Sequence, residues 1–226
     1  MKKFGFVLFL MLVIACLLGS ACGGGEEAGT TSTPTKTSAA TPTKTSASSG
    51  TLSDILSKAE DIANIKYDMI MTAPDMEQTT TKVWLKGKNM KIESTVENET
   101  VITLVDSDAE VMYLYYPAQN NAMKLDFSGA PESDIEGVQS IEQYNPEIVG
   151  TETVDGKVCM VVVYTEEGIE TKVWIWKDKG FPIKVETTTS EGKMTIEWKN
   201  IDFGNIPDST FQLPAGVEIM EFPFST

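Results

Sequence analysis

The sequence contains no histidine and no arginine, and its 18 lysines face 33 acidic residues, for a formal net charge of −15. Without histidine the chain lacks the usual general base and the commonest zinc ligand, and without arginine it lacks a bidentate anion clamp. An acidic surface of this kind repels phosphate backbones, so we expect no nucleic-acid partner. The acidity fits a soluble exported domain.

A long apolar run occurs only at the N-terminus. Lys2 and Lys3 precede the uncharged segment 4–18, and a stretch of small residues follows it. This layout is typical of an export signal. The run is shorter than the roughly 20 apolar residues that a membrane-spanning helix needs. The sequence therefore predicts export with removal of this segment.

The end of this signal, LGSACG at 18–23, resembles a bacterial lipobox. The resemblance implies cleavage after residue 21 and diacylation of Cys22, an anchor of the palmitate type. Gly19 stands where the lipobox favours leucine. Cys16 fits the local pattern as well, but cleavage there would truncate the apolar run. An ordinary secretory signal with an incidental cysteine is the alternative.

Residues 22–50 consist mainly of Gly, Ser, Thr, Ala and Pro. The sequence TPTKTSA occurs twice among them, at 33–39 and 41–47. Such a composition cannot build a packed core, so we predict a disordered tether. Its root-mean-square span would be roughly 30 Å. Its Ser and Thr density also permits O-glycosylation. Folding is then expected in one domain, residues 51–226.

Hydrophobic spacing predicts that this domain is mostly strand. Helices are expected at 51–63 and 131–144, where apolar residues recur at helical intervals. Strands are expected at 65–72, 79–86, 89–96, 100–106, 110–116, 122–127 and 146–154. Four more form a meander through 157–167, 169–178, 181–190 and 193–203, and both faces of its first two strands are apolar, so something must cover each. Two helices are too few to provide crossovers for eleven strands, which indicates antiparallel connectivity.

The C-terminal third carries a family resemblance. VWIW at 173–176, GFPIK at 180–184, IDF at 201–203 and IPDSTFQLP at 206–214, in that order, resemble the LolA/LolB-like superfamily, and more distantly the LppX/LprG lipoproteins. The resemblance covers about residues 52–219. It implies an incomplete antiparallel β-barrel, here of about 11 strands, with two or three helices as a lid over an apolar cavity. In 206–214 a short turn should plug Phe211 and Leu213 into one end of the sheet.

Two departures weaken the transfer of function. The lipoprotein carrier ties its lid to the barrel with an arginine, which this chain lacks, and that carrier is soluble, whereas this chain carries an anchor signal.

Alternation along the strands predicts the residues that face the cavity. Methionine is abundant among them, and its flexible thioether suits acyl chains of varied shape. An ordinary filled core is the alternative. The candidate ligand-binding residues are Met69, Met71, Val83, Leu85, Met90, Ile92, Met123, Leu125, Ile183, Val185, Met194, Ile196 and Trp198.

Other candidates for chemistry have plainer interpretations. Cys159 lies in an apolar strand without a histidine to activate it, so a buried, inert thiol is expected. Asp106, Asp108 and Glu110 imitate the opening of a calcium loop, but the glycine and the later acid of that motif are missing, which favours a charged turn. The pair Glu166-Glu167 lacks a companion nucleophile and is assigned to solvent.

These observations predict a monomeric, non-enzymatic lipoprotein without cofactor or metal, held on the extracytoplasmic face of the cell membrane. The inner leaflet of an outer membrane is possible if the cell has two membranes. Its half-barrel would bind a lipid or the acyl chains of a lipoprotein, as a carrier or a sensor. The alternative is a structural or signalling envelope lipoprotein with a filled core and no ligand.

Overall fold

A computed structural model describes residues 50–96, 98–126 and 133–221. The signal, the tether and Cys22 lie outside these residues, as does the expected strand end at Phe127. In the described chain, helical structure occurs as α2 (Leu52–Leu56), α3 (Asp134–Gln139) and the 3-10 turns η1 (Ser57–Asp61), η2 (Ser140–Tyr144) and η3 (Asp208–Phe211). None of these helices is long and apolar enough to cross a membrane.

The strands occupy most of the remaining described chain. They are β1 (Asn64–Thr72), β2 (Thr79–Lys86), β3 (Asn89–Val96), β4 (Glu99–Asp106), β5 (Val111–Tyr116), β6 (Asn121–Asp126), β7 (Glu147–Val154), β8 (Lys157–Glu166), β9 (Ile169–Trp176), β10 (Pro182–Thr189), β11 (Gly192–Asp202) and β12 (Glu218–Glu221).

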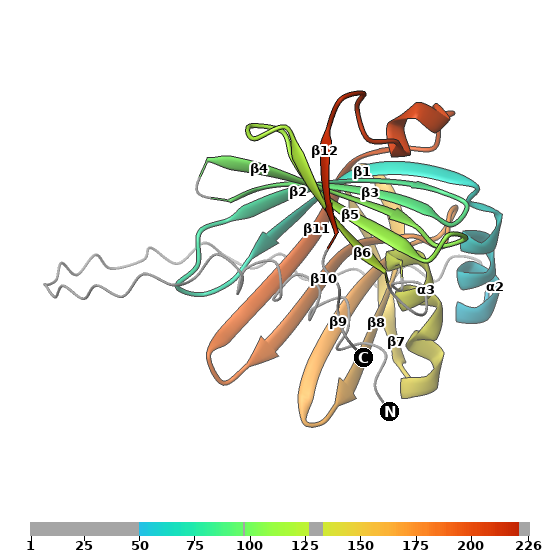
Figure 1. Cartoon of the computed structure of the whole chain (residues 1–226). Helices are drawn as coiled ribbons and strands as arrows, with labels where there is room; N and C mark the ends of the chain where they lie inside the picture. The colour runs from blue at the N-terminus through green and yellow to red at the C-terminus, as the bar shows by residue number, and fades with distance from the viewer. Residues whose placement is uncertain (1–49, 97, 127–132, 222–226) are drawn as a thin grey trace, which may run out of the picture. The chain divides into compact units, whose positions relative to one another are not determined.

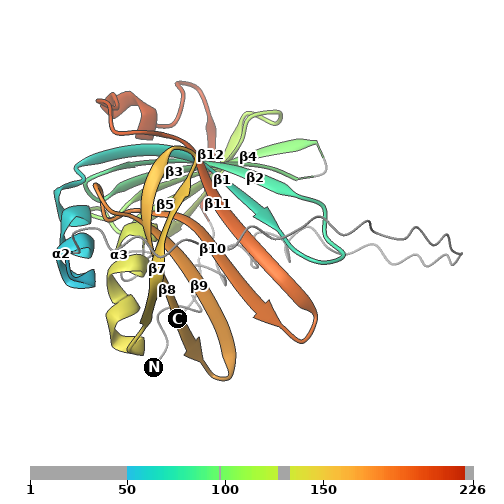
Figure 2. The same ribbon diagram turned by 180° about the vertical axis from the view of Figure 1, so that it is seen from behind.

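All twelve strands belong to one sheet, in the order β12-β6-β5-β4-β3-β2-β1-β11-β10-β9-β8-β7. Neighbours are consecutive hairpins except where β1 pairs with β11, which joins the two halves of the chain, and where β12 joins β6. The sheet curves strongly but stays open, with β7 and β12 as its edges (Figures 1 and 2). The predicted incomplete antiparallel barrel is confirmed.

One strand departs from the prediction. β12 adds a twelfth strand, and it runs parallel to β6, with Ile219 opposite Ala122. All four of its residues are exposed, and its sequence has no apolar alternation that packs on the core. Its place depends on the free edge of β6, which local sequence does not reveal.

Turn chemistry explains the tight hairpins. Asp155 and Gly156 both adopt positive φ, 49° and 73°, between β7 and β8. Two such residues in succession match the right-handed twist of paired strands, and Asp-Gly tolerates this conformation well. The expected turn at 155–156 therefore connects the edge strand to the meander.

The first helix begins with a capping box. The Asp54 N–H donates to the Thr51 side chain at 3.2 Å, and the Thr51 N–H donates to the Asp54 carboxylate at 2.9 Å. These bonds satisfy backbone donors that a helix start leaves unpaired. The helix lies where the sequence predicts it, but its second half, η1, tightens to 3-10 geometry.

Three helical segments, α2, α3 and η2, pack on the concave face of the sheet, over β8 and β9 (Figure 1). This contact forms a hydrophobic core cluster that consists of the chain's own apolar side chains. Its members are Leu52, Ile55, Leu56, Val138, Ile141, Met160, Val162, Tyr164, Val173 and Ile175.

The convex face of β8 and β9 is covered in a different way. The Trp174 ring lies there, with Lys172 and Lys184 over it at 4.4 and 4.9 Å from the ring centroid. Its Nε1–H donates to Glu152 at 2.7 Å. Val161, on the same face, is completely buried. The expectation that both faces of these strands are covered is confirmed, and on the convex side long polar side chains contribute to the cover.

Near the C-terminus, η3 lies against β3 and β4. Phe211 and Leu213, predicted to plug the sheet, are half-buried. Ile206 is the deeply buried residue of this segment, and its carbonyl accepts a hydrogen bond from Lys86 at 2.9 Å. The plug is therefore made mainly by Ile206.

Candidate functional site

The strand register places all thirteen predicted ligand-binding residues on the concave face. Directly opposite residues of paired strands share a face, and the register pairs Met69 with Trp198 and Val83 with Ile92. Leu85–Met90, Met71–Ile196 and Val185–Ile196 are further pairs of the set. Met123 and Leu125 of β6 join the same face through their partners on β5, Leu114 and Met112. The sequence alternation thus identified one continuous surface.

The thirteen residues differ in depth. Seven are buried, namely Met69, Val83, Leu85, Met90, Ile92, Ile183 and Trp198. Six are half-buried, namely Met71, Met123, Leu125, Val185, Met194 and Ile196. A ligand can reach the half-buried side chains without displacing the core, so these are the better candidates for contact.

Four of the half-buried residues lie close together where β1, β11 and β10 adjoin. Ile196 sits between Met71 on one neighbouring strand and Val185 on the other, and Met194 is the next residue of β11 on this face. We call Met71, Val185, Met194 and Ile196 the apolar mouth. Val185 also packs against the core under the helices, so the apolar mouth adjoins the packed region directly.

Ile183 and Trp198 belong to that packed region. Phe181 is completely buried, and its ring lies 5.4 Å from Tyr67 and 6.3 Å from Trp198, centroid to centroid. Ile183 is also fully buried. This part of the concave face is filled by the protein itself.

An acid ties α3 to this aromatic cluster. The Tyr67 hydroxyl and the Trp198 Nε1–H both donate to the Asp134 carboxylate, at 2.6 and 3.0 Å. Burial raises the pKa of Asp134, although both hydrogen bonds act in the opposite direction. Burial and the neighbouring carboxylate raise the pKa of Tyr67 well above its ordinary value, so its hydroxyl stays a donor.

Sequence reasoning missed this contact. Asp134 stands 67 residues from Tyr67 and 64 from Trp198. The available signal was an acid just before the apolar helix positions Ile135 and Val138, which by itself is typical of a helix start.

The structure also places Cys159 and the acidic turn that resembles a calcium loop. Cys159 is free and fully buried, as predicted, and burial raises the pKa of its thiol to about 11. In the β4–β5 turn, Asp106 accepts the N–H groups of Asp108 and Ala109, and Lys88 pairs with Asp108 at 2.7 Å. The predicted charged turn is confirmed. Across the described ranges, no group of three or more acidic or cysteine side chains could hold a metal ion.

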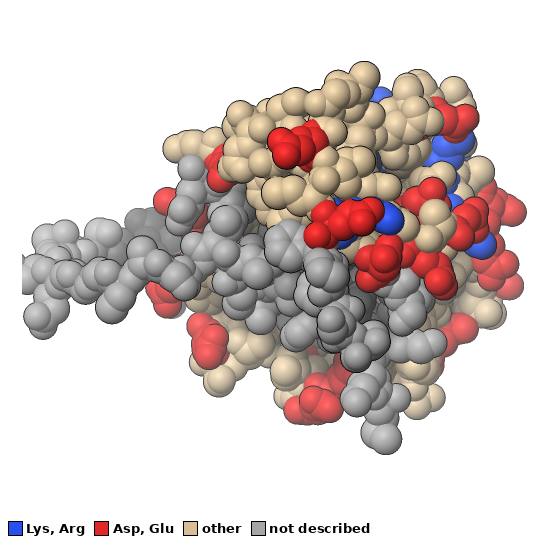
Figure 3. All heavy atoms as spheres, viewed as in Figure 1, with Lys and Arg blue, Asp and Glu red and all other residues tan. Residues whose placement is uncertain are grey.

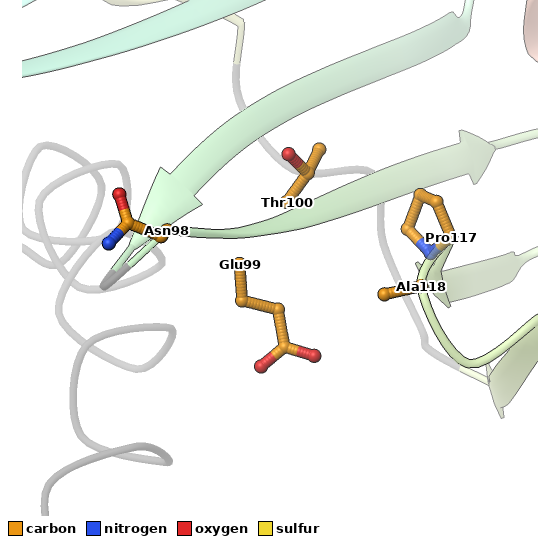
Figure 4. A pocket seen from close by; sticks show the side chains of 5 residues that line it. All are labelled: Asn98, Glu99, Thr100, Pro117 and Ala118. Carbon is orange, nitrogen blue, oxygen red and sulfur yellow. The ribbon is translucent and has the colours of Figure 1, made fainter.

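A separate surface hollow of about 490 Å³ lies between the β3–β4 and β5–β6 turns (Figure 4). It is lined by Asn98, Glu99, Thr100, Pro117 and Ala118. Glu99, its charged group, already accepts a hydrogen bond from Gln119 at 2.9 Å. The hollow contains none of the predicted ligand-binding residues.

A family model described as a domain of unknown function, DUF4412, matches residues 66–180. The chain belongs to the DUF4412 family. The matched region runs from β1 to the turn after β9, so it includes α3 with Asp134 and much of the concave face. A comparison with curated proteins finds no match.

Solved structures share the DUF4412 chain's fold. An uncharacterized conserved protein from Thermus thermophilus aligns at 12% identity over 75% of this chain and 98% of its own, with a TM-score of 0.54. LprF from Mycobacterium bovis also matches, at 13% identity over 74% of this chain and 95% of its own, with a TM-score of 0.49. The lipoprotein LppX from Mycobacterium tuberculosis matches at 13% identity over 69% of this chain and 94% of its own, with a TM-score of 0.42. The open, mostly antiparallel sheet that the LolA/LppX-like resemblance implies is present in the structure. At these identities the likeness concerns the fold alone.

Proposed function

We propose that this protein is an extracytoplasmic lipoprotein, anchored through Cys22, whose concave face binds a lipid or the acyl chains of a lipoprotein. The apolar mouth carries this proposal, because four half-buried apolar side chains, two of them methionine, adjoin a packed aromatic core. Acyl chains gain about 0.8 kcal/mol for each methylene removed from water. Such a surface therefore supports binding rather than catalysis.

The expected affinity is modest. Burying about half of a sixteen-carbon chain would provide roughly 6 kcal/mol before the costs of association. After those costs, the expected Kd lies in the micromolar range at best. That range suits a carrier or sensor that must release its ligand.

A second function has an observation of its own. The helices and β8–β9 fill their part of the concave face with the protein's own side chains. If the same packing extended to the apolar mouth, the protein would be a structural or signalling envelope lipoprotein without a ligand. Ligand binding separates the two functions.

The test uses a fluorescent fatty acid and the chain expressed without residues 1–22. We expect saturable binding by the wild type and loss of binding in Ile196→Glu, because a carboxylate at the apolar mouth must be desolvated by the bound chain. The control is Glu197→Gln, on the opposite face of the same strand, which should bind as the wild type does.

Two further measurements make the result decisive. Melting curves must show that Ile196→Glu is folded, and Ile196→Trp, which fills the apolar mouth without charge, should also weaken binding. If the folded wild type binds no probe, the lipid-binding function is rejected and the structural one takes its place.

A further inference from the structure

Most lysines of the described chain are already neutralised. Ten of the fourteen form ion pairs with Asp or Glu, and these ten are Lys66, Lys82, Lys86, Lys88, Lys91, Lys124, Lys172, Lys184, Lys193 and Lys199. The other four are Lys58, Lys157, Lys177 and Lys179, and they make no ion pair within the described residues. All four lie at the same end of the sheet.

Two aromatic rings lie among these four lysines. Trp176 and Phe203 are half-buried, with ring centroids 5.9 Å apart. The Lys157 ammonium lies 5.4 Å from the Trp176 centroid, and the Lys179 ammonium lies 5.0 Å from the Phe203 centroid. Lys58 reaches across from η1 and donates to the Lys177 carbonyl at 2.6 Å. We call these six residues the basic–aromatic patch.

The backbone that carries the patch is firmly held. The N–H groups of Lys179 and Gly180 both donate to the Trp176 carbonyl, at 3.1 and 2.8 Å, and the Lys177 N–H donates to the Val158 carbonyl at 3.0 Å. Gly180 packs so closely under α2 that an added Cβ would lie 2.3 Å from the Ile55 carbonyl oxygen. The patch is therefore a preformed surface.

Nearby acids only partly offset this charge. Asp155 pairs with Lys199 at 2.7 Å and also interacts with Lys157, whereas Asp202 pairs with Lys66 at 3.1 Å. Asp54 interacts electrostatically with Lys58. Asp178 is in the turn itself, and Glu60 and Asp61 follow Lys58 in η1 as an acidic border. The rest of the protein is strongly acidic, and the face in Figure 3 shows mostly Asp and Glu among its charged groups.

We propose that the basic–aromatic patch is a docking surface for a membrane that carries anionic lipids. Lysines attract anionic headgroups, and a tryptophan ring prefers the boundary between headgroups and acyl chains. A chain with a net charge of −15 is repelled by such a membrane in most orientations, so the patch also selects the orientation of approach. The turn that bears it packs on α2, close to Gly50, where the described chain begins.

This inference goes beyond the proposed ligand site and does not depend on it. The test is vesicle flotation of the chain expressed without residues 1–22, which has no acylated cysteine. The probe is phosphatidylglycerol-containing vesicles, with pure phosphatidylcholine vesicles as comparison. We expect binding to the anionic vesicles only, weakening as salt is added.

Charge variants locate the surface. Each lysine near an anionic bilayer contributes about a fivefold factor in partitioning, so Lys157→Gln/Lys179→Gln should lose on the order of 25-fold. The matched control is Lys82→Gln/Lys193→Gln, which changes the net charge equally at ion-paired lysines away from the patch and should bind like the wild type. Asp178→Asn should bind about fivefold better.

Tryptophan quenching by brominated lipids tests the contact directly. We expect quenching in the wild type and in Trp84→Phe, and its loss in Trp176→Phe. Equal losses of vesicle binding in both lysine double variants would overturn the proposed docking role of the patch. Quenching that persists in Trp176→Phe would overturn it as well. So would binding to heparin without binding to anionic vesicles, which would indicate an acidic polymer as partner. Fatty-acid binding should be unchanged in all patch variants, so failure here is distinct from failure of the proposed function.

Discussion

At the scale of single residues, Asp134 shows most clearly how a polar group shapes this fold. Its carboxylate satisfies two donors, Tyr67 and Trp198, that the aromatic cluster would otherwise leave unpaired. A buried donor without a partner costs about 1–3 kcal/mol. Asp134 therefore fastens the start of α3 to β1 and β11, at the border between the packed region and the apolar mouth.

Asp134 also gives stability a pH dependence with a definite sign. Burial raises its pKa above the ordinary value of 3.8, so folding favours the protonated form. Its contribution is fully present below pH 3.8 and is lost as the pH rises through the folded-state pKa. In Asp134→Asn the uncharged amide oxygen can still accept both bonds, so this contribution should no longer vary with pH.

We therefore expect the stability advantage of the wild type over Asp134→Asn to shrink as the pH rises from about 4 towards neutrality. Asp134→Ala should lose about 2–4 kcal/mol across the same range, because both donors are left unpaired. Urea unfolding at several pH values measures both effects. A constant difference between the wild type and Asp134→Asn would show that the charge does not titrate in this interval.

At the scale of elements, the contact between α2 and the β9–β10 turn decides how the helices sit. Gly180 has a φ of 66°, and its missing side chain lets the Ile55 carbonyl approach. Any side chain there must push α2 away from the sheet, and α2 contributes Leu52, Ile55 and Leu56 to the core cluster under the helices. Gly180 therefore allows the β9–β10 turn to pack directly against α2, which covers part of the concave face.

Gly180→Ala should cost about 2–4 kcal/mol, since backbone strain and a steric clash add. Gly168→Ala is the matched control, because Gly168 has a similar φ of 83° but nothing within 4 Å of its added Cβ. The control should cost only about 1 kcal/mol. Thermal or urea unfolding of the two variants gives the comparison, and equal losses would mean that strain alone, without the contact to α2, explains the effect.

At the scale of the whole molecule, the open sheet, the predicted anchor and the surface charge all bear on how the domain would approach a membrane. The sheet ends at two free edges, β7 and β12, so the concave face is not enclosed by strands. The predicted anchor at Cys22 would hold the domain near a membrane, and the proposed basic–aromatic patch would set the orientation of the domain there. Carriage or sensing of a lipid requires such proximity.

Cys22→Ser tests the anchor. Without the acylated thiol, the protein should appear in the soluble fraction or remain as an unprocessed precursor, and the wild type should fractionate with membranes at mature size. Cell fractionation with mass determination gives the answer. If the variant stays on the membrane at mature size, Cys22 is not the anchor.

Much of the secondary structure could be predicted because its causes are local. The alternation Met194, Ile196, Trp198 marks one face of β11 whatever β11 pairs with, and Asp155-Gly156 makes a tight turn from its own backbone preferences. The thirteen candidate residues were found on one face for the same reason. Their division into a packed region and an apolar mouth was not predictable, because it depends on where α2 and α3 lie.

The sequence by itself determined an antiparallel, mostly β-stranded domain, its strand faces, its turns and its overall acidity, since these follow from composition and from neighbours a few residues apart. Only the tertiary structure decided the pairing of β1 with β11, the parallel β12, the tie of Asp134 to Tyr67 and Trp198, and the gathering of four lysines around Trp176 and Phe203. Each of these brings together residues far apart along the chain. Such contacts form only when the sheet curves and the helices close on it, and no short sequence pattern encodes that geometry.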